Sequence, residues 1–187
     1  SGEVVVCSTG LIGELLPMRK IISGIDRITK ELHQKALEEV AKAIMTTDSV
    51  AKIANFKCDD FEVSGVAKGA GMLAPALATM LSVVMTDAIL PDGAQEIFQR
   101  VCDRTYNRID SDGCTSTNDT VLLMGSGASG HAPSPVDFET ALMQVCGSLS
   151  QQLIADAEGS TKTVAIKVSG AMTEEDAVQV ARACARN

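Results

Sequence analysis

The chain has 187 residues, of which 45% are hydrophobic and 3% are aromatic. This length and hydrophobic share fit one globular domain and exclude a disordered chain. A formal net charge of -8 argues against nucleic acid or an anionic membrane as a partner, because both are bound through clustered Lys and Arg.

The cysteine pattern argues against a metal centre. Six cysteines are scattered without a C-x-x-C pair, and the chain contains two histidines. We therefore expect no metal site, and mostly small buried cysteines in a reducing compartment such as the cytoplasm. No charged-then-apolar leader opens the chain, so we expect no signal peptide. The longest apolar run, residues 72–85, is interrupted by Pro75 and is too short to span a bilayer.

The first half of the chain predicts two strand regions around a helix. Three consecutive valines at residues 4–6 predict a short strand. Apolar residues at helical spacing predict a helix over residues 28–44. Next, residues 50–56 and 61–66 read as strands that a turn joins into a hairpin. Residues 79–85 fit a strand or a helix, and the β-branched pair within them favours the strand.

The second half predicts helices alternating with strands. The expected elements are a helix opened by Pro91 and ending near Ile109, a loop over 110–118, a buried strand over 120–124, a long helix capped by Ser134, a strand over 163–168 and a last helix begun by Thr173. The mixture predicts an α/β layered sandwich, with residues 1–187 in a single domain.

A glycine motif at residues 125–130 has the spacing of a dinucleotide-binding loop. In such a loop the third glycine opens a helix, whereas residues 131–135 here contain two prolines. No second strand ends in an acidic residue at the required distance. We therefore do not expect nucleotide binding.

Thr79 is the most informative residue. It follows a run of small residues and opens an apolar stretch, as expected of a site of self-cleavage at the Ala78–Thr79 bond. A threonine becomes an effective nucleophile when it is the first residue of a chain, because its own α-amino group then serves as the base. The alternative interpretation is a buried threonine in a core element.

Five motifs in order resemble the glutamate N-acetyltransferase/ornithine acetyltransferase family of arginine biosynthesis. They lie at residues 5–18, 43–48, 67–81, 116–120 and 157–159. The resemblance covers essentially the whole chain, which we expect to be about the middle half of a longer, self-cleaving family member.

The resemblance implies an acetyl transfer from N-acetylornithine to glutamate through an acetyl-threonine ester on Thr79, after cleavage between Ala78 and Thr79. Thr9 and Gly10 match the oxyanion-hole positions, which stabilise the charge on the acetyl oxygen. The residues matching substrate-binding positions are Thr46, Lys68, Thr79 and Glu158.

The resemblance also implies a layered α-β-β-α sandwich like that of the self-cleaving ornithine acetyltransferases and aminopeptidases. It implies no bound cofactor, leaves open acetyl-CoA as a co-substrate, and suggests a heterotetramer of cleaved α and β chains. Two departures stand out: Ala76 replaces a frequent Asn, and the motif that completes the substrate pocket would lie beyond Asn187. Two alternatives stay open, a non-catalytic fragment of the family and a self-cleaving amidase or aminopeptidase.

Overall fold

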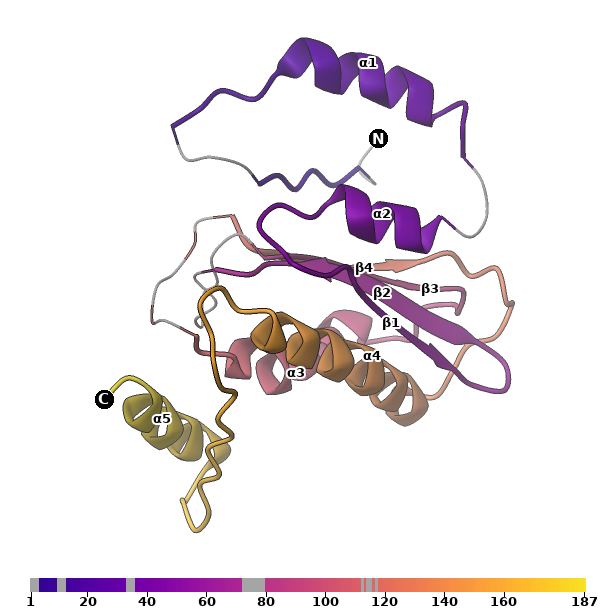
Figure 1. The fold of residues 1–187 in the computed structure, drawn as a ribbon. Helices are drawn as coiled ribbons and strands as arrows, with labels where there is room; N and C mark the ends of the chain where they lie inside the picture. Colours follow the sequence, from indigo (N-terminus) through magenta and orange to yellow (C-terminus); the bar gives the residue numbers. More distant parts are fainter. Residues whose placement is uncertain are drawn as a thin grey trace.

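The structure is a computed structural model in which α-helices lie on both faces of one β-sheet (Figure 1). It describes residues 4–9, 13–32, 36–71, 80–111, 113, 116 and 118–187. The four strands, in spatial order across the sheet, are β1 (Lys52–Lys57), β2 (Glu62–Lys68), β3 (Leu81–Thr86) and β4 (Thr120–Gly125).

The first three strands are antiparallel neighbours, whereas β4 runs parallel to β3. The predicted hairpin is confirmed: the Cys58 N–H donates to the Phe61 carbonyl at 2.9 Å, which closes the turn between β1 and β2. A parallel pair needs a crossover connection. Helix α3 (Ala94–Arg104) and the 3-10 helix η1 (Tyr106–Arg108) supply it between β3 and β4.

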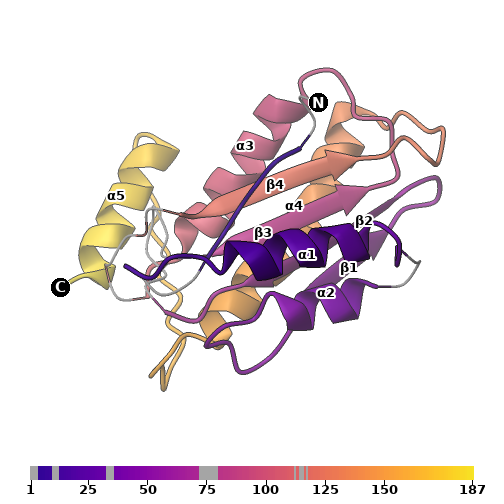
Figure 2. The same cartoon turned by 90° about the horizontal axis from the view of Figure 1, so that it is seen from above.

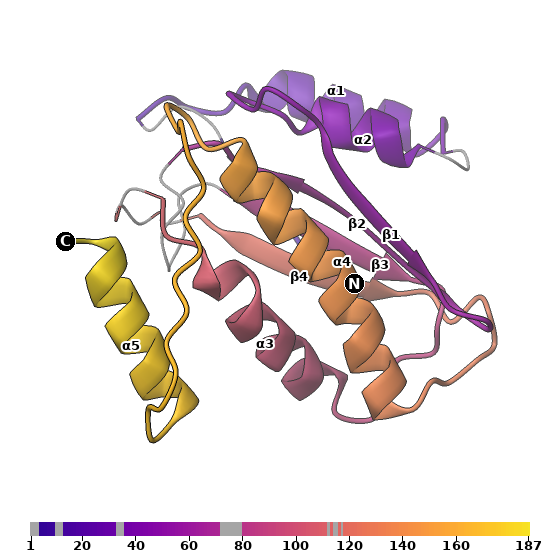
Figure 3. The same ribbon diagram turned by 60° about the horizontal axis from the view of Figure 1, so that its bottom comes forward.

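The helices separate onto the two faces of the sheet. Helices α1 (Met18–Ile28) and α2 (Leu37–Ala43) lie over one face, and α3 and α4 (Pro135–Ala155) cover the other (Figure 3). Helix α5 (Glu174–Ala185) lies outside the sheet, at the end where β3 and β4 begin (Figure 2). The mixed α/β class is confirmed, and the two-sheet sandwich stays a prediction because the described strands form one sheet.

The main core lies between the sheet and α4. Val63, Val84, Leu142 and Leu149 are fully buried there, and each such side chain contributes about 1.5–3 kcal/mol to stability. The α4 start follows its predicted cap: the Ser134 hydroxyl accepts the Asp137 N–H at 3.2 Å. The sequence places this cap correctly because Ser followed by Pro is a strong helix-start signal.

Three predicted elements differ from the structure. The valines at 4–6 and the alternating residues 163–168 are not strands, because neither segment pairs with a described strand. The side chains of Val6 and Val164 are 84% and 75% exposed. The single helix predicted over 28–44 is wrong: α1 ends at Ile28 and a separate α2 begins at Leu37. Leu32, whose spacing from Ile28 favours a continuous helix, lies outside both helices and is 79% exposed.

The glycine motif behaves as its sequence context predicts. Gly127 and Gly130 have φ values of 67° and 70°, in the left-handed region that favours glycine. The motif follows β4, but α4 begins only at Pro135. The loop therefore does not present a helix N-terminus at its third glycine, as a dinucleotide site requires.

Gly65 marks a close approach of β2 to α4. A Cβ atom at Gly65 would lie 2.9 Å from Leu149 Cδ1 and 3.1 Å from Val145 Cγ1. We expect Gly65→Ala to lower the free energy of unfolding by about 1–3 kcal/mol through overpacking. Gly147, on the same helix, has no atom within 4 Å of such a Cβ, so Gly147→Ala is expected to raise stability by about 0.5–1 kcal/mol. Urea unfolding measures both, and equal destabilisation by the two variants would contradict this packing.

Candidate active site

The strand register brings one set of strand ends together. Lys68, the last residue of β2, pairs with Leu81 of β3, and Leu81 pairs with Thr120 of β4. The residues just outside these pairs, Met80 and Asp119, therefore lie at the same end of the sheet as Lys68. Thr79, the predicted nucleophile, directly precedes Met80 in the chain and lies outside the described residues.

Lys68 and Thr46, two predicted substrate-binding residues, are in direct contact. The Lys68 Nζ donates a hydrogen bond to the Thr46 hydroxyl at 2.7 Å. Lys68 is only 2% exposed, whereas Thr46 is exposed on the loop after α2. Burial lowers the pKa of Lys68, and the nearby carboxylates of Asp48 and Asp119 oppose this effect. The site thus combines the buried ammonium of Lys68 with Thr46, an exposed residue whose hydroxyl that ammonium contacts.

Asp48 holds this pair in place through three hydrogen bonds. Its Oδ1 accepts the Gly69 N–H at 2.6 Å and the Lys52 ammonium at 2.7 Å, and its Oδ2 accepts the Thr46 N–H at 3.1 Å. Burial alone would raise the pKa of Asp48, but these partners lower it overall. The carboxylate thereby fixes the backbone on both sides of the Lys68–Thr46 contact.

Lys52 extends the network below the site. Its side chain is fully buried at the start of β1, and its ammonium also pairs with Asp156 Oδ2 at 2.6 Å. Asp156 in turn accepts the Ser49 N–H at 3.0 Å. A buried lysine between two carboxylates is a paired charge, which is the condition under which burial is tolerated.

Glu158, the third predicted substrate-binding residue, lies close to the segment that follows Lys68. Its backbone N–H donates to the Ala70 carbonyl at 2.5 Å. A Cβ atom at Gly71 would lie 3.4 Å from Glu158 Oε2, so the carboxylate is close to this backbone. A cavity of about 310 Å³, lined in part by Ala70, Asp110 and Glu158, opens beside it. This volume is at the lower end of the range for small-molecule sites.

Asp119 is a site residue that the sequence predictions did not single out. Its Oδ1 accepts the Met80 N–H at 2.7 Å, next to the predicted nucleophile. Burial raises the pKa of Asp119 to about 6, against smaller opposing effects of the Met80 N–H, the Ser116 hydroxyl and the Lys68 charge. Asp119 lies within the family-like motif at residues 116–120, and this motif is the feature of the sequence that indicates it. Its contact with Met80 depends on the parallel pairing of β3 and β4.

The remaining predicted residues are placed only in part. Thr9 is described and half-buried, and its oxyanion-hole role stays a prediction. Gly10, Ala78 and Thr79 lie outside the described residues, so the cleavage site and the nucleophile also stay predictions.

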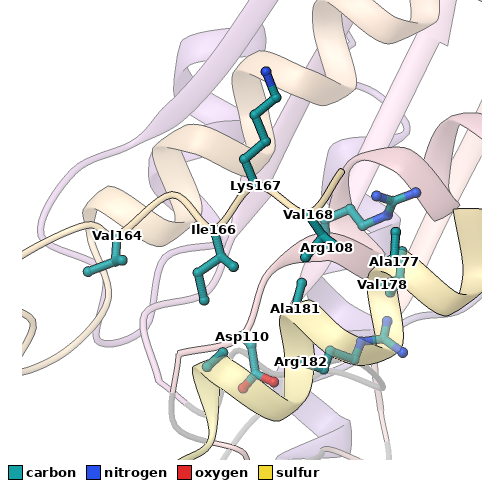
Figure 4. A pocket seen from close by; sticks show the side chains of 11 residues that line it. Arg108, Asp110, Val164, Ile166, Lys167, Val168, Ala177, Val178, Ala181 and Arg182 are labelled. Carbon is teal, nitrogen blue, oxygen red and sulfur yellow. The ribbon is translucent and has the colours of Figure 1, made fainter. Parts of the chain in front are cut away.

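A different cavity, of about 370 Å³, lies beside α5 (Figure 4). Arg108 and Arg182 contribute to its wall, together with apolar side chains of α5 and of the extended segment 164–168. Arg108 pairs with Glu174 at 2.6 Å, and Arg182 donates to the Asn107 carbonyl at 2.7 Å. These bonds attach α5 to η1, so the cavity belongs to the packing of α5.

The helices that the structure describes include none that is both long and apolar enough to cross a membrane. Among the same residues, no cluster of three His, Cys, Asp or Glu side chains could hold a metal ion.

Comparisons with known proteins identify the family of the chain. The ArgJ family model matches residues 1–187. The chain is 53% identical over 186 residues to the arginine biosynthesis bifunctional protein ArgJ of Thermobifida fusca, covering 99% of this chain and 49% of that protein. It is 53% identical over 188 residues to the protein of the same name from Streptomyces avermitilis, covering 100% of this chain and 49% of that protein. The chain thus spans about half the length of these curated relatives.

Proposed function

Because the chain belongs to the ArgJ family, we propose that it carries the catalytic core of an acetyltransferase that moves an acetyl group from N-acetylornithine to glutamate. The observation that carries the proposal is the contact between Lys68 Nζ and Thr46 Oγ1, at the end of the sheet where β3 begins. A buried ammonium at this end suits substrates that both contain an α-carboxylate.

The proposed chemistry has two half-reactions after self-cleavage frees the Thr79 amine. In the first, Thr79 Oγ attacks the acetyl carbonyl carbon while its proton passes to the Thr79 α-amine. The acetyl C–N bond then breaks, and ornithine leaves with that proton on its nitrogen. In the second, the amine of glutamate attacks the ester carbon and passes a proton to the Thr79 α-amine. The ester C–O bond then breaks, N-acetylglutamate is released, and that proton restores the hydroxyl of Thr79.

The charges at the site support distinct roles for three residues. Lys68 binds the α-carboxylate, and the exposed hydroxyl of Thr46 contributes a second polar contact. The Glu158 carboxylate, beside the 310 Å³ cavity, takes the amine end of ornithine. Thr9 and Gly10 supply the oxyanion hole, as the family resemblance implies.

The wider setting is also part of the proposal. Cleavage at Ala78–Thr79 yields α and β chains, which assemble as a heterotetramer in the cytoplasm and form a layered α-β-β-α sandwich. The support is the family membership, since about half of each curated relative lies outside the matched region. Acetyl-CoA is a second acetyl donor to be tested in the same assay.

The decisive experiment uses the protein at its natural full length. Cleaved protein is incubated with N-acetylornithine, with and without glutamate, and ornithine and N-acetylglutamate are quantified. The proposal expects equal amounts of the two products and little ornithine release without glutamate. Release of ornithine at the same rate in both reactions would identify a hydrolase. No release in either would contradict an acetyl-threonine enzyme.

Lys68→Met tests the carboxylate site separately. We expect the KM for N-acetylornithine and for glutamate to rise about 10–100-fold, the loss typical of one hydrogen bond to a charged group. Lys57→Met is the matched control, because Lys57 is an exposed lysine at the opposite end of the sheet. Steady-state kinetics measure both variants. Unchanged KM values in a folded Lys68→Met protein would remove Lys68 from the substrate site.

A further inference from the structure

Met80, the residue just before β3, is held by hydrogen bonds at both of its backbone polar groups. Asp119 Oδ1 accepts its N–H at 2.7 Å, and its carbonyl accepts the Thr120 N–H at 3.1 Å. Its side chain is fully buried. Asp119, just before β4, and Thr120, the first residue of β4, thus bind the backbone N–H and carbonyl of Met80.

The peptide group between Thr79 and Met80 transmits this restraint. A peptide unit is planar, so the Met80 N–H lies in one plane with the carbonyl and Cα of Thr79. Fixing the direction of that N–H therefore restrains the orientation of the peptide group that joins Met80 to the preceding residue. Once the Ala78–Thr79 bond is cut, this peptide group is the one covalent connection that Thr79 keeps.

We propose that Asp119 is a positioning residue for the Thr79 nucleophile: its Oδ1 sets the orientation of the Thr79–Met80 peptide group. The inference rests on the acetyl transfer proposed above. It assigns Asp119 no contact with the substrate and no proton transfer. The second oxygen, Oδ2, is buried and has no hydrogen-bond partner among the described residues. The carboxylate also interacts with the Ser116 hydroxyl, and the backbone amide that it accepts is that of Met80.

This assignment separates two substitutions of Asp119 by whether an acceptor oxygen remains. Asp119→Asn retains an oxygen that can accept the Met80 N–H, whereas Asp119→Ala removes it. In the full-length protein we expect Asp119→Ala to lower kcat about 100-fold, as a small misplacement of a reacting group can do. The KM for N-acetylornithine should change less than about 3-fold, and Asp119→Asn should keep kcat within about 5-fold of the parent. Each kcat is calculated per molecule of cleaved protein, whose fraction is measured by intact mass.

A matched control lies at the opposite end of the sheet. Asp87 Oδ1 accepts the Glu62 N–H at 2.8 Å, the same kind of bond between a carboxylate and a backbone amide. Asp87→Ala is expected to reduce the melting temperature but to leave kcat unchanged. A purely structural role for Asp119 would make the two alanine variants alike in both measurements.

Hydrogen exchange of the Met80 amide provides a readout that is independent of catalysis. It should accelerate at least about 10-fold in Asp119→Ala and stay near the parent rate in Asp119→Asn. An Asp119→Ala chain that stays uncut while Asp119→Asn is cut also supports the inference, because the same hydroxyl performs the cleavage. Parental kcat in Asp119→Ala, or equal impairment of the two variants, would overturn it. If the parent protein transfers no acetyl group but the Met80 amide exchanges as expected in all variants, only the proposed function is overturned.

Discussion

Thr79→Ala is expected to abolish both chain cleavage and acetyl transfer. The variant lacks the hydroxyl that attacks the Ala78 carbonyl, so no free α-amine forms at residue 79 and no acetyl ester can be made. We expect a single uncut species by intact mass and at least a 1000-fold loss of transfer, on the order seen when a nucleophile is removed. Both readouts use the full-length protein.

Thr79→Ser is the matched control because it keeps a hydroxyl and removes only the methyl group. It should still cleave and transfer, although more slowly, since the freer serine side chain has more rotamers to restrict. Cleavage in Thr79→Ala would show that another group cuts the chain. Normal transfer by an uncut Thr79→Ala chain would contradict the nucleophile assignment altogether.

The sequence predicts those elements whose signals are local. Turn and cap residues define the β1–β2 hairpin and the start of α4 at Ser134, and a capping threonine defines α5: Thr173 Oγ1 accepts the Asp176 N–H at 3.1 Å. The strand predictions for residues 4–6 and 163–168 are wrong because strand formation depends on non-local pairing. Their β-branched content shows that they suit a sheet, but a strand forms only where a neighbour completes its hydrogen bonds.

The site was predictable only in part, for a similar reason. Thr46 and Lys68 lie in motifs that the family resemblance identifies, and the fold brings them into contact. Lys52 carries no such signal: a lysine at a strand start is normally expected to be exposed, yet here it is fully buried between Asp48 and Asp156. Only the tertiary arrangement, which joins the entrance of β1 to the end of α4, reveals that pairing.

Asp48 connects the buried charges to the proposed substrate site, so its removal is expected to have the largest effect on stability. Asp48→Ala leaves the N–H groups of Thr46 and Gly69 without their acceptor and leaves Lys52 with Asp156 as its one remaining carboxylate partner in the described structure. Breaking a buried ion pair by removing one partner typically costs about 3–5 kcal/mol. We expect a loss of that order in the free energy of unfolding, measured in urea at pH 7.

Two further variants test the origin of this loss. Asp48→Asn keeps Oδ1 for Lys52 and Gly69 but turns an amide donor toward the Thr46 N–H, so its effect should be intermediate. Glu38→Ala removes an exposed ion pair with Lys42 and should cause no measurable change. If Asp48→Ala were as stable as Glu38→Ala, the buried network would not contribute to the fold.

The pH dependence of the same variant gives an independent check with a defined sign. The pKa of Asp48 is lower in the folded protein than its ordinary value of 3.8. The unfolded chain therefore binds this proton more readily, and the stabilisation by Asp48 is fully present above the unfolded pKa. It is lost as the pH falls through the folded pKa. The stability difference between the parent and Asp48→Ala should thus be constant from about pH 5 to pH 8 and shrink below about pH 4. If the stability difference grew as the pH fell, Asp48 would not be stabilised in its charged form in the folded protein.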